Sequence, residues 1–442
     1  MEDAYVERVI DLTDASANRI HNMSLDEARA RVADGPAARV REIDGSFTLV
    51  ARRGRRVRLA RSLDRPLRYF LAKQAAGPAL VVSDRMDAIH AFLRTEGLAA
   101  QFHPSYTRMV PAHYLVDIEL VGCPDPSPSY ERYFMPSLAR WPADPEAIGR
   151  AYVSALADEI AKELAAMPPE APVGVAFSGG VDSGAVFLVT HHVLRRLGMS
   201  PARLKAFTLT VGRNGRDLEQ ARAFLDPLGL SLFHEPIEAD PASLDPLETV
   251  RLIEDYKPLD VESATMALAL CRGIRARYPD WSFLLDGDGG DENLKDYPIE
   301  ENPELTIRSV VNNPLLYQEG WGVGRMKHSL TYSGGQSRSY TRTWAPLRFL
   351  GFEGFSPFTR PRVVEVAEAI PFAEMAAGDT ARLYALKGEI VARGVEAVTG
   401  LTMPVFPKRR FQHGALPEGE PSRRRLPLGE AAYRSHFLSR YA

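Results

Sequence analysis

A single apolar stripe at helical spacing marks the segment that begins near residue 146. It contains Ile148, Tyr152, Ala155, Leu156, Ile160 and Leu164. Residues three or four positions apart share one face of a helix, so this stripe predicts a helix packed against a core. Pro168 and Pro169 follow, and proline cannot continue a helix interior. We therefore expect the helix to end before residue 168.

Short apolar runs then alternate with helical patterns. The expected strands are 173–177, 204–211, 232–236 and 282–285, with helices at 184–197 and 217–228 and two more before the last strand. Strands that alternate with helices are typical of a parallel sheet covered on both faces. We predict a doubly wound α/β domain in which ligands bind at the carboxyl ends of strands. Residues from about 300 onward are expected to be mostly helix and loop.

The first part of the chain has the pattern of short strands. Residues 46–51 and 55–60, joined by a turn at Arg53-Gly54, predict a hairpin, and 79–83 predicts another strand. Three prolines between 122 and 129 indicate a linker. The expected organisation is a β-rich domain at 1–125, a linker at 126–145, an α/β domain at 146–415 and a tail at 416–442.

The composition excludes several classes of protein. The 442 residues are 45% hydrophobic and 25% charged, with a net charge of −3, so no overall field recruits nucleic acid or an anionic membrane. No apolar run reaches the roughly 18 residues that span a bilayer, and the N-terminus lacks the pattern of a signal peptide. Two cysteines, Cys123 and Cys271, exclude a disulfide framework. We expect a reduced, cytoplasmic protein without a membrane or nucleic-acid partner.

The segment Phe177-Ser-Gly-Gly-Val-Asp-Ser183, between a predicted strand and a predicted helix, is the strongest candidate for chemistry. Adjacent glycines let the backbone approach an anion closely, and the helix that follows presents free N–H groups. The two serines add hydroxyl donors. An aspartate beside a bound phosphate would repel it unless a cation lay between them, which implies Mg²⁺. The candidate phosphate- and metal-binding residues are Ser178, Gly179, Gly180, Asp182 and Ser183.

This loop is not a Walker A loop, which would need Gly-x-x-x-x-Gly-Lys-Ser/Thr. It resembles the pyrophosphate loop of the N-type ATP pyrophosphatases, which include asparagine synthetase, GMP synthetase and NAD synthetase. The resemblance implies an adenine nucleotide alpha hydrolase-like fold. It also implies cleavage of ATP between the α and β phosphates, adenylation of a substrate oxygen, and displacement of AMP by a nitrogen nucleophile. The alternative is a turn without a ligand, as we infer for Ser333-Gly-Gly-Gln-Ser337, which follows no apolar strand.

A second motif, Asp286-Gly-Asp-Gly-Gly-Asp-Glu292, follows the last predicted strand. It resembles the Ser-Gly-Glu-Gly-Ser-Asp-Glu segment of asparagine synthetases. By that resemblance Asp291 is the second Mg²⁺ ligand and Gly287 lies beside AMP. Asp288 takes the position of the catalytic carboxylate, which is Glu in asparagine synthetase and Tyr in β-lactam synthetase. The alternatives are an exposed acidic turn or a calcium loop, although the EF-hand spacing is incomplete.

A third segment, Pro407-Lys-Arg-Arg-Phe-Gln-His-Gly414, resembles the Arg-x-Lys-x-x-Phe-x-x-Gly segment that closes over the synthetase site. Lys408 then matches the lysine that neutralises charge developing on the α-phosphate and the acyl-adenylate. Taken alone, three adjacent cations also fit a solvated surface loop. Residues 206–212 match the strand whose end contacts adenine through its backbone, here at Leu209.

The segment Gly351-Phe-Glu-Gly-Phe-Ser-Pro-Phe358 resembles the family's Gly-x-Glu-x-Arg-x-Pro-Phe-Leu-Asp. Phe355 replaces the arginine of that pattern, and Thr359 and Arg360 replace its final Leu-Asp. We therefore expect one wall of the site to differ from that of asparagine synthetase, which argues against plain aspartate as the substrate.

The family's glutaminase domain has a cysteine nucleophile at position 2, where this chain has Glu2. Three segments nevertheless resemble parts of that domain, namely 43–47, 59–70 and 110–114. We expect a degenerate, structural Ntn-type domain in the first 125 residues and an enzyme that does not use glutamine.

Together these features predict an ATP- and Mg²⁺-dependent synthetase. It would adenylate a small-molecule or peptide-borne carboxylate for attack by an amine or free ammonia, with Asp288 accepting a proton and Lys408 stabilising charge. An intramolecular lactam-forming synthetase and a non-catalytic nucleotide-binding partner remain alternatives. A tRNA-modifying sulfur transferase is disfavoured because the cysteines are poorly placed and the net charge is negative. Whether the chain forms a homodimer stays open.

Overall fold

The computed structural model describes residues 8–73, 79–119, 128–212, 215–297, 299–301, 305–313, 338–407, 414–415 and 428–442. These residues form two compact units. The described residues among 1–135, 318–340 and 434–442 make up the first unit, and those among 136–317 and 341–433 make up the second. Glu2, Cys123, the 333–337 segment and Lys408 lie outside the described residues. In the described part of the chain, no helix is both long and apolar enough to cross a bilayer.

The first unit contains the predicted hairpin. Strands β4 (Thr48–Arg53) and β5 (Arg56–Arg61) pair antiparallel around Gly54, whose φ of 57° is left-handed. With β9 (Tyr114–Glu119) and β10 (Ser129–Arg132) they form a sheet in the order β10-β9-β5-β4. Strand β10 thus lies in the segment that we expected to be a linker.

A second four-stranded sheet completes this unit, in the order β1-β7-β6-β8. It comprises β1 (Arg8–Asp11), β6 (Arg68–Ala72), β7 (Ala79–Ser83) and β8 (Arg108–Met109). The expected strand at 79–83 is therefore confirmed as β7. A short pair, β2 (Arg19–Ile20) and β3 (Gly45–Ser46), lies outside the two sheets.

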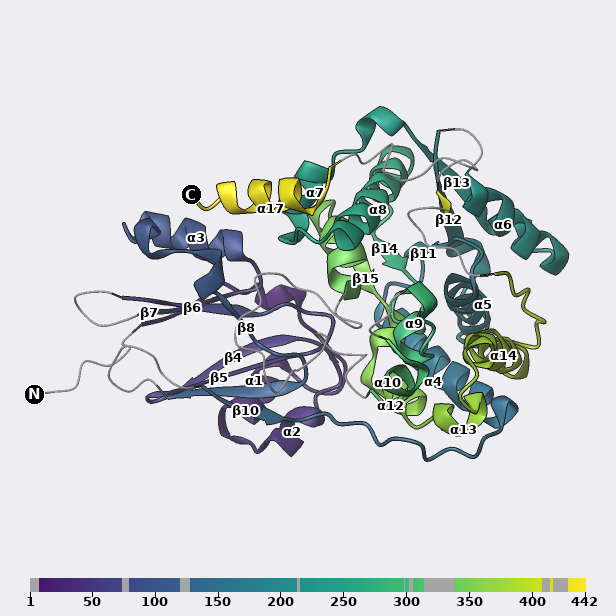
Figure 1. Ribbon diagram of the computed structural model, residues 1–442, viewed down its shortest axis with the longest axis horizontal. Helices are drawn as coiled ribbons and strands as arrows, with labels where there is room; N and C mark the ends of the chain where they lie inside the picture. Colours follow the sequence, from purple (N-terminus) through teal and green to yellow (C-terminus); the bar gives the residue numbers. More distant parts are fainter. Residues whose placement is uncertain are drawn as a thin grey trace, which may run out of the picture. The chain divides into compact units, whose positions relative to one another are not determined.

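Both sheets contribute to one buried apolar cluster: Val57, Leu59, Leu67, Tyr69, Leu80, Val82, Val110, Val116 and Ile118. The sheets therefore pack face to face. Helices α1 (Leu25–Asp34) and α2 (Ala37–Arg41) cover one sheet and α3 (Met86–Thr95) covers the other (Figure 1). The unit has helix–sheet–sheet–helix layers, so the prediction of a smaller, β-rich N-terminal part is confirmed.

The second unit is built on a five-stranded sheet in which every neighbouring pair is parallel. Its order is β13 (His234–Ala239), β12 (Leu204–Val211), β11 (Val173–Ala176), β14 (Phe283–Leu285) and β15 (Glu353–Phe355). The predicted α/β fold with a parallel sheet is confirmed, as are three of the four predicted strands.

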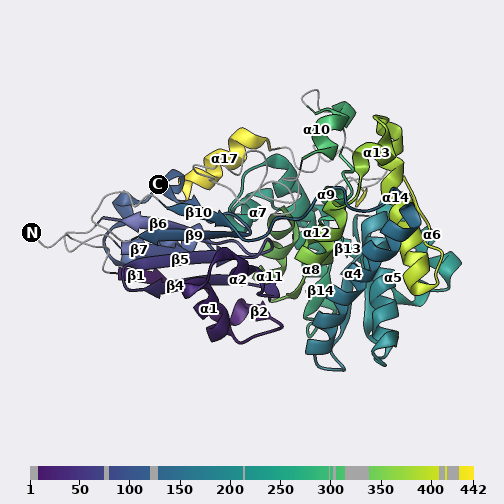
Figure 2. The same cartoon turned by 90° about the horizontal axis from the view of Figure 1, so that it is seen from below.

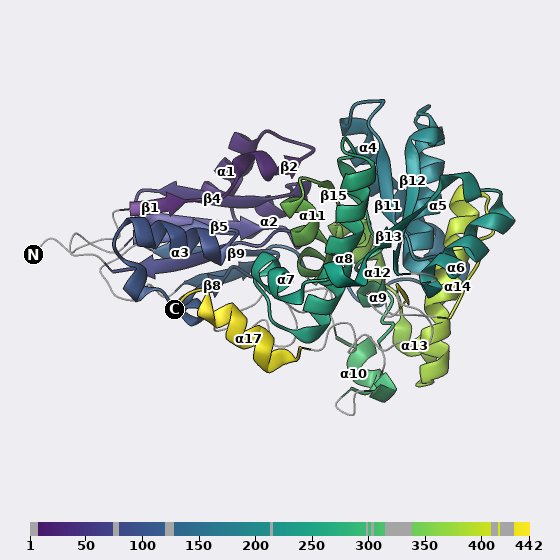
Figure 3. The same cartoon turned by 90° about the horizontal axis from the view of Figure 1, so that it is seen from above.

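Helices lie on both faces of this sheet. The described helices of the unit are α4 (Pro145–Ala166), α5 (Val181–Arg196), α6 (Arg216–Leu225), α7 (Pro246–Ile253), α8 (Pro258–Arg277), α9 (Gly290–Asn293), α10 (Ile307–Val311), α11 (Ala345–Phe349), α12 (Pro361–Glu368), α13 (Phe372–Ala376) and α14 (Thr380–Thr399). The apolar stripe that predicted α4 is buried. Helices α4, α5 and α14 lie side by side (Figure 2), and α8 lies on the other side of the sheet from α5 (Figure 3).

Two details of the predicted sheet are wrong. Residues 231–233 form a 3-10 turn, so β13 begins two residues later than expected and runs to Ala239. This strand contains Pro236, which is tolerated because β13 is an edge strand. Strand β15 lies in the region expected to be helix and loop. A Cβ at Gly354 would be 1.7 Å from the carbonyl oxygen of Leu284, so this pairing depends on a glycine that carries no apolar signal.

The order of the strands places the two glycine-rich motifs together. From β11 the chain moves through β12 to the edge strand β13, and then returns over α7 and α8 to β14, on the other side of β11. Ligands of open α/β sheets bind where the strand order reverses in this way. Because β11 and β14 are parallel neighbours, the loops that follow them lie at the same edge of the sheet.

Candidate active site

The loop after β11 is held in shape by its own hydroxyl groups and by α6. The hydroxyls of Ser178 and Ser183 are 3.1 Å apart, and the Gly180 N–H donates to Ser178 Oγ at 3.3 Å. Gly179 has a φ of 72°, and a Cβ there would be 2.9 Å from the backbone of Gln220. The glycine is therefore needed both for its backbone conformation and for close packing. Gly180 precedes the first residue of α5, so the loop leads directly to a helix N-terminus.

Glycines of the second motif pack directly against Asp182. A Cβ at Gly287 would be 2.8 Å from the backbone nitrogen of Ser183, and a Cβ at Gly290 would be 2.1 Å from Asp182 Oδ1. No side chain fits at either position without displacing the loop after β11. The structure therefore brings the two motifs into contact, with the Asp182 side chain seated against Gly290.

Lys387 of α14 lies at the centre of this arrangement. Its Nζ donates to Asp182 Oδ2 at 2.6 Å and contacts Asp291 Oδ1, and it is 3.4 Å from Asp296 Oδ2. The lysine side chain is only 5% exposed. Two of the carboxylates come from the two predicted motifs, so the structure brings Asp182 and Asp291 together on the ammonium of Lys387.

The charge of Lys387 is determined by these carboxylates. Burial by itself lowers the pKa of a lysine, but Asp182, Asp291 and Asp296 outweigh this effect and raise the pKa well above its ordinary value. Lys387 therefore stays protonated throughout the physiological range. A carboxylate cluster that already accommodates one cation has the oxygen donors that Mg²⁺ prefers. Among the described residues no three acidic, His or Cys side chains are grouped as a metal site.

We did not anticipate Lys387 from the sequence. It lies on the buried face of α14 with Leu383, Leu386, Ile390 and Val391. A single lysine within an apolar stripe is a signal that a buried acid must be near, because a lone charge in a core is strongly unfavourable. The stripe does not say which acid that is.

Asp288 lies at the end of the same loop, half-buried. Its N–H donates to Asp286 Oδ1 at 2.9 Å, and its Oδ2 accepts from the Thr343 hydroxyl at 2.6 Å. Burial raises the pKa of Asp288, as do the neighbouring charges of Asp291 and Asp260, while Thr343 and Arg342 oppose the rise. A carboxylate with a raised pKa is suited to accept a proton.

Three more buried acids are linked to Asp288 by charge, either directly or through one another. Asp286 is 4% exposed, and burial, followed by the charge of Asp288, raises its pKa well above the ordinary range. Asp260 is 2% exposed and pairs with Arg342, whose Nε is 2.8 Å from Asp260 Oδ1. Asp255 is fully buried, and burial together with the charge of Asp260 raises its pKa to about 7. This side of the site is strongly acidic.

Replacing Asp255 with asparagine should change how stability depends on pH. Because the pKa of about 7 exceeds the ordinary value of 3.8, the folded protein holds a proton that the unfolded chain has lost, and the free energy of unfolding falls as pH rises from about 4 to 7. Asparagine keeps the oxygen that accepts from the Lys257 N–H and cannot ionise. We compare the free energy of unfolding of Asp255→Asn with that of the unmodified protein at each pH. We expect this difference to favour the variant by about 2–3 kcal/mol more at pH 8 than at pH 5. Urea unfolding at both pH values checks this, and an equal difference at the two pH values would contradict it.

The altered wall of the site has a structural explanation. The guanidinium carbon of Arg360 lies 4.5 Å from the centre of the Phe355 ring, and its Nη2 is 2.7 Å from Glu163 Oε1. Both charged side chains are at most 4% exposed. Phe355 and Arg360 are the two positions where the family pattern has Arg and Asp. The two replacements thus act together, in a cation–π contact supported by a buried ion pair with α4.

Replacing Glu163 with glutamine should therefore destabilise the second unit. The change keeps the volume but removes the charge of the carboxylate that Arg360 Nη2 binds, and breaking a buried ion pair typically costs about 3 kcal/mol or more. Asp158→Asn is the matched control, because the Asp158–Arg362 pair also joins α4 to α12 but is exposed at 38% and 57%. Urea unfolding should give a loss for Asp158→Asn below about 1 kcal/mol. Similar losses in the two variants would contradict the role of Arg360.

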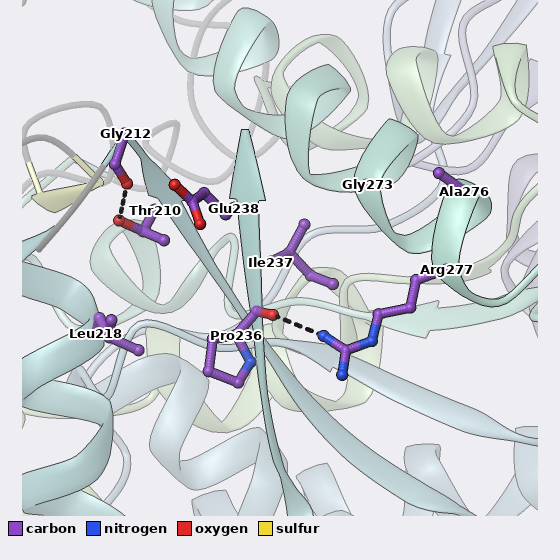
Figure 4. Close-up of a pocket in the computed structure, with 9 residues that line it drawn as sticks. All are labelled: Thr210, Gly212, Leu218, Pro236, Ile237, Glu238, Gly273, Ala276 and Arg277. Carbon is purple, nitrogen blue, oxygen red and sulfur yellow. Dashed lines mark hydrogen bonds between the residues drawn. The ribbon is translucent and has the colours of Figure 1, made fainter. Parts of the chain in front are cut away.

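The end of β12 carries a separate hollow. Leu209 is buried in this strand, and Val211 donates its N–H to Ala415 O at 2.9 Å. Beside it lies a cavity of about 620 Å³ (Figure 4). It is lined by Thr210, Gly212, Leu218, Pro236, Ile237, Glu238, Gly273, Ala276 and Arg277. The lining contains none of the acidic residues that contact Lys387.

In the first unit the three segments expected to be remnants of a glutaminase meet. Ser62 N–H donates to Phe47 O at 2.9 Å, and Arg61 Nε donates to Val110 O at 2.6 Å. His113 donates its N–H to Arg61 O. Burial lowers the pKa of the His113 side chain to about 3. These polar groups are buried inside the first unit.

Residues 154–350 match the family model described as asparagine synthase. The matched residues include strands β11 to β14 and both glycine-rich motifs, and they exclude residues 1–135 and α14. Among curated proteins, none matches the chain. The match supports an adenine nucleotide alpha hydrolase-like fold and, in general terms, an ATP-dependent ligase that forms amide bonds.

Proposed function

We propose that the chain joins a carboxylate to an amine in two steps, since residues 154–350 match the family model described as asparagine synthase. The observation that carries the proposal is the convergence of Asp182 and Asp291, from loops at adjacent strand ends, on the cation of Lys387. In the first step a carboxylate oxygen attacks the α-phosphorus of ATP, and the bond to the departing pyrophosphate breaks. In the second step an amine attacks the acyl carbon, and the carbon–oxygen bond to AMP breaks.

The residues of the site have distinct roles in this reaction. The triphosphate would bind at the loop of Ser178 to Ser183, whose hydroxyls and free backbone N–H groups suit phosphate oxygens. Mg²⁺ held by Asp182 and Asp291 would shield the negative charge of the phosphates. Lys387 keeps both carboxylates in place and adds a permanent positive charge beside the departing pyrophosphate.

The second step needs a base and further positive charge. Asp288 is placed to accept a proton from the amine, since its pKa is raised and its Oδ2 is fixed by Thr343. By resemblance, Lys408 would stabilise the charge of the acyl-adenylate. The raised pKa of Asp288 supports its assignment as base, although its side chain is one methylene shorter than the family's glutamate.

Glutamine is not the proposed source of nitrogen, because position 2 is Glu2 and not cysteine. The helix–sheet–sheet–helix layers of the first unit and the contact of its three family-like segments support a degenerate Ntn-type domain. An amine or free ammonia would then enter from solution. Tyrosine is absent from position 288, which favours an intermolecular amide over a lactam.

Two other functions fit the observations less well. A non-catalytic nucleotide-binding protein would have no need of the Asp182–Lys387–Asp291 arrangement together with a buried base. A sulfur transferase needs a reactive thiolate, but Cys271 is fully buried and its burial raises the pKa of the thiol.

The test is release of pyrophosphate from Mg·ATP with a panel of amino acids and related carboxylates, with and without ammonia. We expect release that depends on one carboxylate and is lost in Asp182→Ala. Asp280→Ala, which removes an exposed acid after α8, is the matched control and should keep full activity. Release without any carboxylate, or release that persists in Asp182→Ala, would overturn the proposal.

A further inference from the structure

Four acidic side chains form a series that is linked by hydrogen bonds and by charge: Asp255, Asp260, Asp288 and Asp286. Asp286 accepts from the Asp288 backbone, Asp288 accepts from Thr343, and Arg342, the residue before Thr343, binds Asp260 at 2.8 Å. Burial, followed by the charge of Asp260, raises the pKa of Asp255. The series therefore begins at the N-terminus of α8 and reaches the proposed base.

Two oxygens in this series have no hydrogen-bond donor in the part of the chain that the structure describes. Asp286 Oδ2 and Asp255 Oδ2 are buried and have no hydrogen-bond partner among the described residues. Their residues are 4% and 0% exposed. A buried carboxylate oxygen without a donor is costly, and such atoms are rare in folded proteins. Two of them in one cluster indicate a ligand that brings its own donors.

The guanidinium of Arg342 is the positive charge within this cluster, and it does not donate to the two oxygens without a partner. Arg342 is surrounded by Asp260, Glu292 and Asp288, all of which raise its pKa. A guanidinium that already faces three carboxylates will not attract a fourth from a substrate. Its buried Nη2, which also has no partner among the described residues, suits a neutral acceptor such as a carbonyl oxygen.

The expected ligand is an organic cation and not a second metal ion. In the described part of the chain no three of these side chains converge as metal ligands do. An ammonium group has three donors that point in different directions, so it can satisfy carboxylates that do not meet at one point.

We propose that the nucleophile of the amide-forming step is a primary alkylammonium, which binds as a cation at Asp286 and Asp288. This rests on the proposed function. One proton passes from the ammonium to Asp288, and the neutral amine attacks the acyl carbon. The C–N bond forms as the carbon–oxygen bond to AMP breaks, and the second proton leaves with the AMP phosphate. An α-amino acid is disfavoured as the nucleophile, because its carboxylate would face the same acids.

Binding of propylammonium chloride to the full-length protein tests this proposal by calorimetry at constant ionic strength. We expect propylammonium to bind, and propionate and the zwitterion β-alanine to bind at least about tenfold more weakly. Asp286→Asn should weaken propylammonium binding about tenfold or more, whereas Asp280→Asn, at the exposed turn after α8, should leave it unchanged. If Asp286→Asn does not fold, Asp255→Asn provides the second test, with weaker binding again expected.

Equal affinity for β-alanine, or unchanged binding in both acid variants, would overturn the proposal. Pyrophosphate release measured on the same protein separates this outcome from failure of the proposed function. Release with no propylammonium binding overturns the inference alone. Binding without release for any carboxylate overturns the proposed function and leaves the cation site in place.

Discussion

Replacing Lys387 with methionine is expected to abolish pyrophosphate release and to lower the free energy of unfolding by about 3 kcal/mol. The ammonium is the shared partner of Asp182, Asp291 and Asp296 in a position that is 5% exposed. Methionine has a similar length and no charge, so the three carboxylates would repel one another. Asp182 would then leave its position against Gly290, and the phosphate loop would lose its geometry. Urea unfolding and pyrophosphate release from Mg·ATP measure the two effects.

Lys295→Met is the matched control for this prediction. Lys295 is also buried and pairs with Glu368 at 2.5 Å, in the same unit, but it does not contact the two glycine-rich motifs through that pair. We expect a comparable loss of stability with pyrophosphate release retained, when both variants are measured at a temperature where they stay folded. Near-normal pyrophosphate release in Lys387→Met would show that this lysine is not needed for the reaction. A total loss in Lys295→Met would show that instability alone explains the effect.

Replacing Lys408 with alanine is expected to slow amide formation by about a thousandfold without changing stability. The reason is that charge on the α-phosphate and the acyl-adenylate grows in both transition states, and a cation there stabilises them more than the bound substrates. The last residue of the segment and the residue after it pack against the second unit. A Cβ at Gly414 would be 1.9 Å from Asp217 Oδ1, and Ala415 O accepts from the Val211 N–H at the end of β12.

The neighbouring cation provides the control for Lys408. Arg409→Ala removes the same charge one position further along, and it should leave the rate within a few-fold of the unmodified enzyme if the effect is specific to position 408. Single-turnover measurement of AMP formation, with urea unfolding of each variant, gives both quantities. Equal losses for the two variants would mean that the segment acts only through its overall charge.

The sequence by itself determined the elements with strong local patterns. The stripe at 148–164, the apolar runs before residues 178 and 286, and the hairpin turn at Gly54 each carry their signal within a few residues. Both glycine-rich motifs could be assigned to strand ends for the same reason, and the parallel order followed from the alternation of strands and helices. Strand β15 was missed because three residues around a glycine show no such pattern.

Only the tertiary structure decided which charges meet. Lys387 is 96 residues from Asp291 and 205 from Asp182, and nothing local to α14 identifies its partners. The same holds for Arg342 with Asp260 and for Arg360 with Glu163, whose separations are 82 and 197 residues. The physical reason is that hydrophobic periodicity reports which face of an element is buried. Pairing of buried charges depends instead on how distant elements pack, which the chain decides only when it folds.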